Sequence, residues 1–174
     1  GIAELTIHGR TRCQMYRGDA DWTLIREVKN NPRIHIPIIG NGDVSTPERA
    51  KECFDNYGID AIMIGRATFG CPWIFQDIQH YLNTGELLPE RSMQWCIDIL
   101  KEHVERSIEW IGDERKGIVH SRRHFAASPV FKGLFDFRQT RIALLRADSK
   151  AEVFQIMDEI VEKWGNRPIL PSDK

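Results

Sequence analysis

The first part of the chain alternates short apolar runs with segments that repeat at helical spacing. Three runs rich in β-branched residues are each followed by glycine-containing sequence, as expected of strands that end in turns. Two segments between these runs have amphipathic spacing, and Ser45, Thr46 and Pro47 supply the cap and first turn of the second. The predicted strands are 3–7, 36–39 and 61–64, and the predicted helices are 22–29 and 47–57. This order predicts successive β-α units around a parallel sheet.

The pattern changes after Leu88, where strand-like runs stop. Residues 92–111 have apolar side chains at helical spacing and are followed by Gly112, which predicts one long amphipathic helix. Ser149 and Glu152 form a capping box ahead of a second regular segment, which ends near Trp164. Weaker helical segments are predicted at 117–127 and 138–146. The second part of the chain is therefore predicted to be helical.

These patterns divide the chain into an α/β part, residues 1–88, and an all-α part, residues 89–174. Three β-α units cannot close an eight-stranded parallel barrel, which takes about 250 residues. They also bury the faces of an open parallel sheet poorly. Since the sequence opens at Gly1 with an apolar stretch following at once, we expect the α/β part to be the C-terminal portion of a larger domain.

Composition narrows the class of protein. The 174 residues are 41% hydrophobic and 28% charged, which is ordinary for a folded domain and argues against intrinsic disorder. No run of about 18 apolar residues and no secretory leader occur, so we expect no membrane segment and a cytoplasmic location. The four cysteines form no CxxC pair, so we expect reduced thiols and no metal site.

Charge is distributed unevenly along the chain. Residues 115–146 contain eight Lys or Arg residues and one acid, Asp136, which gives a net charge of +7 inside a chain whose total is −1. Two interpretations are open. The charges belong either to a solvated helical face or to a surface that binds a polyanion such as a nucleic acid, and the near absence of acids favours the second.

Candidate ligand-binding residues follow the three predicted strands. They are His8-Gly9-Arg10, Gly40-Asn41-Gly42-Asp43 and Gly65-Arg66. The carboxyl ends of parallel strands are where α/β proteins bind ligands, glycines let the backbone approach an anion, and an arginine pairs with phosphate through two hydrogen bonds. The repetition of these motifs predicts a site for a phosphate-bearing ligand.

Other interpretations of the same residues are open. Any single glycine turn is more often simple loop chemistry than a ligand site. His8 is either an interior structural histidine or a ligand contact. Asp43 either faces the ligand or caps the helix that follows it.

The motifs together resemble one known family. His8-Gly9-Arg10-Thr11-Arg12, Met15-Tyr16-Arg17-Gly18 with Asp21-Trp22, Gly40-Asn41-Gly42-Asp43, Gly65-Arg66-Ala67 and Pro72-Trp73-Ile74-Phe75 occur in order, followed by Arg122-Arg123-His124 and Lys132-Gly133. In this combination the chain resembles the tRNA-dihydrouridine synthases, and most closely the bacterial B-type subgroup. The similarity covers nearly the whole chain.

The resemblance implies a fold and a reaction. Residues 1–88 would form the last three β-α units of an FMN-binding (β/α)8 TIM barrel, and residues 89–174 a helical tRNA-binding domain. FMN would be reduced by NADPH and would pass a hydride to C6 of a uracil in tRNA. The family's proton-donor cysteine lies outside this chain, so the chain alone is expected to be inactive.

The resemblance also implies roles for individual residues. The FMN site would include His8, Arg10, Asn41, Gly42, Asp43, Gly65 and Arg66. The tRNA would contact Arg122, Arg123 and Lys132. Cys71, in the tripeptide Gly70-Cys71-Pro72, is not assigned as the proton donor, because it follows the last strand and precedes a helix opened by Pro72.

Some residues of the second part have two interpretations each. Its aromatic side chains either stack on bases or, as is more common, fill the helical core: Trp95, Trp110, Phe125, Phe131, Phe135 and Phe137. In the first part, Arg12 and Tyr16 are placed to face the substrate end of the flavin.

Two alternative functions compete with the flavoenzyme hypothesis. The chain could be a nucleic-acid-binding or regulatory module without flavin chemistry, in which the helical part acts alone. It could also be a phosphate-binding barrel enzyme that acts on a small metabolite. The strand-end ligand residues argue against the first alternative, and the basic helical part is unexplained by the second.

Overall fold

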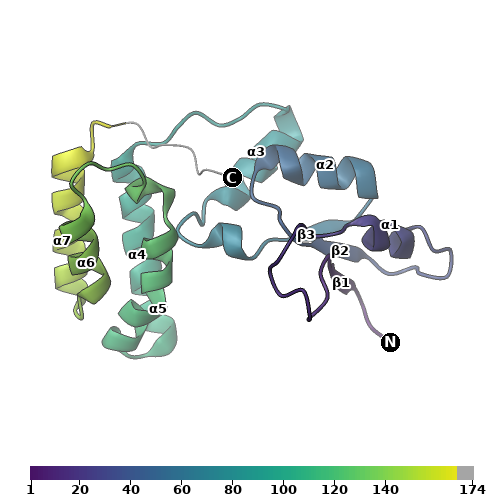
Figure 1. Cartoon of the computed structure of the whole chain (residues 1–174), viewed down its shortest axis with the longest axis horizontal. Helices are drawn as coiled ribbons and strands as arrows, with labels where there is room; N and C mark the ends of the chain where they lie inside the picture. The colour runs from purple at the N-terminus through teal and green to yellow at the C-terminus, as the bar shows by residue number, and fades with distance from the viewer. Residues whose placement is uncertain (168–174) are drawn as a thin grey trace. The chain divides into compact units, whose positions relative to one another are not determined.

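A computed structural model describes residues 1–167 (Figure 1). The chain divides into two compact units. Unit 1 comprises residues 1–68 and 72–88, and unit 2 comprises the short segment Phe69–Cys71 together with the chain from Pro89 onward. The last seven residues of the predicted helical part, 168–174, lie outside the described residues.

Unit 1 is an α/β unit with a three-stranded parallel sheet in the order β1-β2-β3. Its elements are β1 (Leu5–His8), α1 (Thr23–Lys29), β2 (Ile38–Asn41), α2 (Pro47–Tyr57), β3 (Ala61–Met63), the 3-10 turn η1 (Arg66–Thr68) and α3 (Ile74–Thr84). Figure 1 shows α2 and α3 beside each other, and these two helices pack together. The predicted α/β class and the parallel β-α order are confirmed.

The first two strands begin two residues later than the apolar runs predicted, and they end one and two residues later. Leu5 is paired with Ile38 and His8 with Asn41, so the ladder continues into polar residues. Apolar patterning reports burial, whereas a strand ends where its hydrogen bonds end, and the two boundaries differ here. The shift brings His8 and Asn41 into the sheet itself.

Trp22 fills the space beneath β2 in the core of unit 1. Its side chain is 1% exposed, and its indole N–H donates to the Gly42 carbonyl at 2.9 Å. A Cβ on Gly40 would stand 2.2 Å from the Trp22 ring, so only glycine fits at this strand position. Packing against one large aromatic ring therefore explains a glycine that the sequence indicated only as a turn residue.

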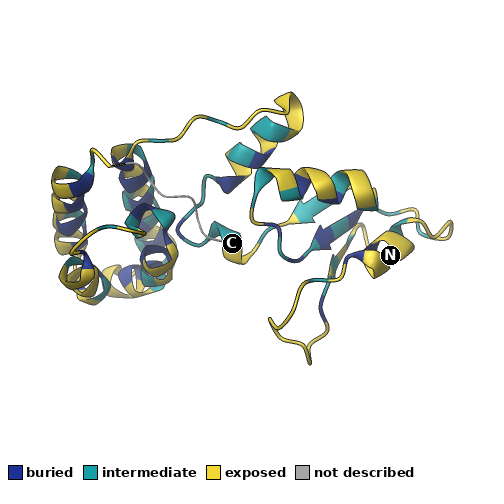
Figure 2. Cartoon of the chain, turned by 45° about the horizontal axis from the view of Figure 1, so that its top comes forward, coloured by how far each residue is buried: buried dark blue, intermediate teal, exposed yellow. Residues whose placement is uncertain are grey.

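Unit 2 is helical within the described residues. Its elements are α4 (Met93–Ile111), α5 (Glu114–Ala127), the 3-10 turn η2 (Pro129–Phe131), α6 (Arg138–Arg146) and α7 (Lys150–Trp164). The four helices predicted from the apolar spacing are confirmed. Figure 2 shows their buried residues gathered on the helix faces that turn toward one another. No helix among residues 1–167 is long and apolar enough to cross a membrane.

Helix α5 begins three residues earlier than predicted. Asp113 caps it by accepting a hydrogen bond from the Lys116 N–H at 2.8 Å. The polar first turn carries no apolar periodicity, so the spacing argument could not detect it. Gly117 then lets α5 approach α4 closely, because a Cβ there would stand 2.7 Å from the Ile108 Cα.

Segment 69–71 is fastened to the C-terminal end of α5, inside unit 2. The Gly70 N–H donates to His124 Nδ1 at 3.3 Å, and the Ser128 hydroxyl donates to the Gly70 carbonyl at 2.8 Å. Phe69 makes an edge contact with the His124 ring, at 5.4 Å between centroids. These contacts satisfy both backbone polar groups of Gly70 in a buried position.

His124 belongs to a cluster of imidazoles. Its ring centroid lies 4.0 Å from that of His103 and 6.4 Å from that of His120. Burial lowers the pKa of His124 to about 4, and the neighbouring charges of His103, Arg123 and His120 act in the same direction. His124 is therefore neutral at pH 7, and its Nδ1 atom is free of a proton when it accepts from Gly70.

We expect acid to destabilise the protein through His124. Its pKa in the folded state, about 4, is below its ordinary value of about 6.5. The folded state thus binds fewer protons, and the stabilisation is complete above pH 6.5 and is lost as the pH falls to 4. The expected loss in unfolding free energy over this interval is about 3 kcal/mol, measured by denaturant unfolding at several pH values.

His124→Asn provides the control for this prediction. Asparagine keeps a hydrogen-bond acceptor but does not titrate, and His103 and His120, whose pKa values burial also lowers, remain in place. The variant should lose most of the pH dependence between pH 6.5 and 4. An equally steep dependence in the variant would show that other groups cause it.

Candidate functional site

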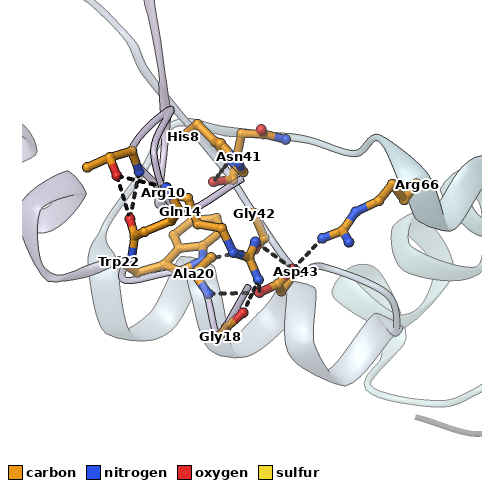
Figure 3. A network of polar contacts seen from close by, with 11 residues as sticks. His8, Arg10, Gln14, Gly18, Ala20, Trp22, Asn41, Gly42, Asp43 and Arg66 are labelled. Carbon is orange, nitrogen blue, oxygen red and sulfur yellow. Dashed lines mark hydrogen bonds and ion pairs between the residues drawn. The ribbon is translucent and has the colours of Figure 1, made fainter. Parts of the chain in front are cut away.

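The predicted ligand residues gather at one edge of the sheet. Because the strands are parallel and adjacent, the ends of β1, β2 and β3 meet there, and His8, Asn41 and Met63 stand in neighbouring register positions. Figure 3 shows His8, Arg10, Asn41, Gly42, Asp43 and Arg66 side by side at this edge. Gly65 directly precedes Arg66, and Thr68 donates to the Gly65 carbonyl through its N–H and its hydroxyl.

Asp43 is the centre of this cluster. Its carboxylate accepts two hydrogen bonds from the Arg10 guanidinium, at 2.9 and 2.5 Å, and one from Arg66 Nη2 at 2.8 Å. It also accepts from the Ala20 N–H at 2.8 Å. Partial burial acts to raise the Asp43 pKa, but the hydrogen bonds and the two positive charges outweigh it and lower the pKa below its ordinary value. Asp43 is therefore a carboxylate at neutral pH.

The alternative role of Asp43 as a helix cap is wrong. Thr46 is the N-cap of α2, and its hydroxyl accepts from the Arg49 N–H at 3.1 Å. Asp43 instead has a left-handed backbone, with φ of 51°, which turns its side chain toward the arginines. The sequence correctly predicted a capping residue at Thr46, but it gave no sign that the Asp43 carboxylate pairs with both Arg10 and Arg66.

Arg10 is buried and holds the loop that follows β1. Its side chain is 3% exposed, and Nη2 donates to the Gly18 carbonyl at 2.5 Å as well as to Asp43. The hydrogen bond to Asp43 raises the pKa of Arg10. Its Nε–H has no partner among the described residues. Arg10 thereby closes residues 11–18 into a fixed loop, the dark purple loop of Figure 1.

Arg66 presents the accessible positive charge of the cluster. Its side chain is 51% exposed, and its guanidinium lies 4.4 Å from the centroid of the Tyr16 ring. Tyr16 and Asp43 together limit the rotamers that the arginine can adopt. The sequence placed Tyr16 near the site by position only, and its contact with Arg66 could not be foreseen because 50 residues separate them.

His8 and Asn41 line the same edge. His8 is exposed, and its Nδ1 lies 3.1 Å from the Asn41 carbonyl oxygen. This exposure does not support the interior structural role considered for His8. The Asn41 amide donates to the Met63 carbonyl at 2.7 Å, across to the end of β3. Both side chains are thus fixed by neighbouring strand ends.

Gly42 and Gly65 differ in the space that surrounds their backbones. A Cβ on Gly42, where φ is 134°, would stand 2.6 Å from the Ala20 Cβ. The lack of a side chain at Gly42 therefore lets the loop after β1 pack closely against it. A Cβ on Gly65 would meet nothing within 4 Å. The backbone at Gly65, beside the exposed Arg66, is therefore open to an anion.

The three predicted tRNA-binding residues differ in their surroundings. Arg122 donates to the carbonyls of Arg146 and Ala147 and to Asp148, so it secures the C-terminal end of α6. Arg123 is exposed on α5, and Lys132 is exposed after η2. Contact of any of the three with tRNA stays a prediction, and Arg122 has a structural role already.

The aromatic residues of unit 2 divide between the two interpretations. Phe125 and Phe137 are buried, and Phe131 and Trp95 are half-buried, as core residues are. Trp110 and Phe135 are instead 80% and 78% exposed. Assigning all six to the core would therefore be wrong for these two. Among residues 1–167 no group of three or more His, Cys, Asp or Glu side chains could hold a metal ion.

Fold and site define an α/β protein in which glycines, arginines and a central carboxylate line the carboxyl edge of a parallel sheet. The chain belongs to the dihydrouridine synthase family, which it matches over residues 1–162. The resemblance to that family and to its B-type subgroup is thereby confirmed.

Curated relatives support this membership. A tRNA-dihydrouridine synthase B of Proteus vulgaris is 48% identical over 124 residues, which are 71% of this chain and 38% of that protein. A protein of the same name from Shewanella oneidensis is 38% identical over 166 residues, 93% of this chain and 50% of that protein. A probable tRNA-dihydrouridine synthase of Rickettsia conorii is 44% identical over 124 residues. The chain spans half or less of the length of these relatives.

Proposed function

We propose that the protein containing this chain reduces specific uridines of tRNA to 5,6-dihydrouridine, with FMN as its flavin and NADPH as the electron donor. Family membership supports the reaction, and the names of the relatives support tRNA as the substrate. The observation that carries the proposal is the cluster at the sheet edge, where Asp43 holds the exposed Arg66 beside the open backbone of Gly65. We also expect the protein to act in the cytoplasm.

The residues present fit the phosphate of FMN. Arg10, Arg66 and Asp43 carry two positive charges and one negative charge, so the cluster has a net charge of +1. Arg66 has guanidinium N–H groups to offer beyond its bond to Asp43, and Gly65 leaves room for an oxyanion at the backbone. Asn41, Gly42 and His8 would hold the rest of the cofactor, while Asp43 and buried Arg10 would position Arg66.

FMN supplies the hydride chemistry when bound. The contribution of this chain would be to bind and orient FMN: Arg66 would neutralise phosphate charge, and Asp43 with Tyr16 would keep its guanidinium in place. Protonation of uracil C5 belongs to a cysteine that the family carries outside the residues present here, so we expect the 174-residue chain alone to be inactive. The basic residues of unit 2 would hold tRNA by its phosphates.

The proposal is tested with the complete protein. We expect a flavin absorbance spectrum, FMN as the released cofactor by mass, and NADPH-dependent formation of dihydrouridine in unmodified tRNA. Arg66→Ala should weaken FMN binding roughly 10- to 100-fold, because a charged hydrogen bond to phosphate contributes about 1.5–3 kcal/mol. The exposed Arg33 provides the matched control, and Arg33→Ala should bind FMN normally. A colourless protein that cannot be reconstituted with FMN would contradict the proposal.

A further inference from the structure

The short turn that carries Arg66 has little packing of its own. The 3-10 turn η1 has three residues, none of them buried, and Gly65 before it is exposed. The Thr68 N–H and hydroxyl donate to the Gly65 carbonyl at 2.9 and 2.8 Å. These hydrogen bonds fix the shape of the turn but not its location, because they join residues of the same turn. The location of its backbone therefore depends on β3 before it and segment 69–71 after it.

Segment 69–71 is held firmly by buried hydrogen bonds. The Gly70 N–H donates to His124 Nδ1 at 3.3 Å, and the Ser128 hydroxyl donates to the Gly70 carbonyl at 2.8 Å. His124 and Ser128 are 7% and 2% exposed, so water does not compete for these bonds. One residue separates Gly70 from Thr68, the last residue of η1. Since a single residue spans only a few ångströms, holding Gly70 restrains the end of the turn.

The backbone of this turn needs a restraint that its side-chain contacts do not give. Asp43 and Tyr16 hold the Arg66 guanidinium, but this group stands at the end of a long side chain with several rotatable bonds. A phosphate at the open backbone of Gly65 would contact the main chain itself. A backbone that is already fixed loses less conformational entropy when the ligand binds, so its affinity is higher.

We propose that His124 and Ser128 are positioning residues for the phosphate group of the flavin. By holding Gly70, they keep the backbone of Gly65 and Arg66 in the conformation that binds the phosphate. The two side chains act through Gly70 and not on the cofactor itself. The inference rests on the proposed function, because it concerns the same phosphate site. A purely structural role would stabilise the fold without distinguishing a flavin that carries a phosphate from one that lacks it.

The test compares the affinities of the complete protein for FMN and for riboflavin, which has the same ring system but no phosphate. The ratio of the two affinities measures the contribution of the phosphate site. Ser128→Ala and His124→Leu should each lower this ratio about three- to tenfold, because the released backbone must be ordered when FMN binds. Their riboflavin affinity should stay unchanged. His124→Asn, which keeps an acceptor for the Gly70 N–H, should retain most of the ratio.

Ser121→Ala is the matched control. Ser121 is a buried serine of the same helix, 0% exposed, and its hydroxyl donates to the Gly117 carbonyl at 2.9 Å, within α5. Its replacement removes one buried hydrogen bond but none to segment 69–71, so the ratio should stay normal. In an Arg66→Ala background, Ser128→Ala should have little further effect on the ratio, because the two changes then act on the same contact.

The possible outcomes separate this inference from the proposed function. Ser128→Ala and His124→Leu remove different hydrogen bonds, so if one variant does not fold, the other still provides the measurement. A normal ratio in the folded variants would overturn the inference and leave the flavin chemistry intact, as would equal losses of FMN and riboflavin affinity. Failure of the unaltered complete protein to bind FMN would overturn both.

Discussion

Replacing Asp43 by alanine is expected to lower the free energy of unfolding by about 3 kcal/mol and to abolish FMN binding at micromolar concentrations. Asp43 is 29% exposed, whereas Arg10 beneath it is 3% exposed and has no other carboxylate in hydrogen-bond contact among residues 1–167. Loss of the carboxylate leaves a buried guanidinium without its counter-charge and also frees Arg66 and the Ala20 N–H. Denaturant unfolding and flavin titration of the complete protein measure the two effects.

Two further variants separate the buried pair from ordinary surface charge. Asp55→Ala removes the exposed partner of Lys51 on α2 and should cost less than about 0.5 kcal/mol. Combining Asp43→Ala with Arg10→Met should restore part of the lost stability, because the uncompensated charge is then gone. A double variant no more stable than Asp43→Ala would contradict this explanation.

Gly70→Ala is expected to destabilise the protein by about 3–4 kcal/mol. The backbone of Gly70 is left-handed, with φ of 70°, which costs an alanine about 1–2 kcal/mol. An added Cβ would also stand 2.4 Å from both the His124 carbonyl oxygen and the Ser128 Cα. These are backbone atoms that no rotamer change can move, so overpacking adds a further penalty of about 1–3 kcal/mol.

Gly112→Ala is the matched control for this prediction. Gly112 ends α4 with φ of 72°, but a Cβ there would meet nothing within 4 Å. It should therefore show only the conformational cost of about 1–2 kcal/mol. Equal losses in unfolding free energy for the two variants would show that segment 69–71 is not held tightly against α5.

Sequence patterning was accurate where a signal is local. The capped helix at 47–57 begins with Thr46 and Pro47 as predicted, and α6 has the predicted bounds, 138–146. Caps, helical spacing and glycine turns involve residues a few positions apart, so they are readable along the chain. The bounds of the three strands differ from the prediction by up to two residues, because hydrogen-bond ladders depend on neighbouring strands that lie more than 20 residues away along the chain.

In the candidate site, too, local features could be predicted from the sequence, whereas contacts between distant residues could not. The sequence indicated that His8, Arg10, Asn41, Asp43 and Arg66 follow parallel strands, and the shared edge of the sheet brings them together. It could not indicate that Asp43 pairs with both arginines, because a carboxylate after a strand has the same local pattern whether it caps a helix or binds a cation. The exposure of Trp110 was equally hidden, since an aromatic residue near a helix end is compatible with either core or surface.

The α/β class, the order of strands and helices, the family resemblance and the basic character of residues 115–146 could all be predicted from the amino-acid sequence. Folding in three dimensions sets which charges are paired, which are left exposed, and that His124 and Ser128 hold Gly70. The two kinds of information differ in the distance along the chain over which the responsible interactions act. Periodicity and capping are set by bonds within a few residues, whereas burial and ion pairing depend on elements that meet only after the chain has folded.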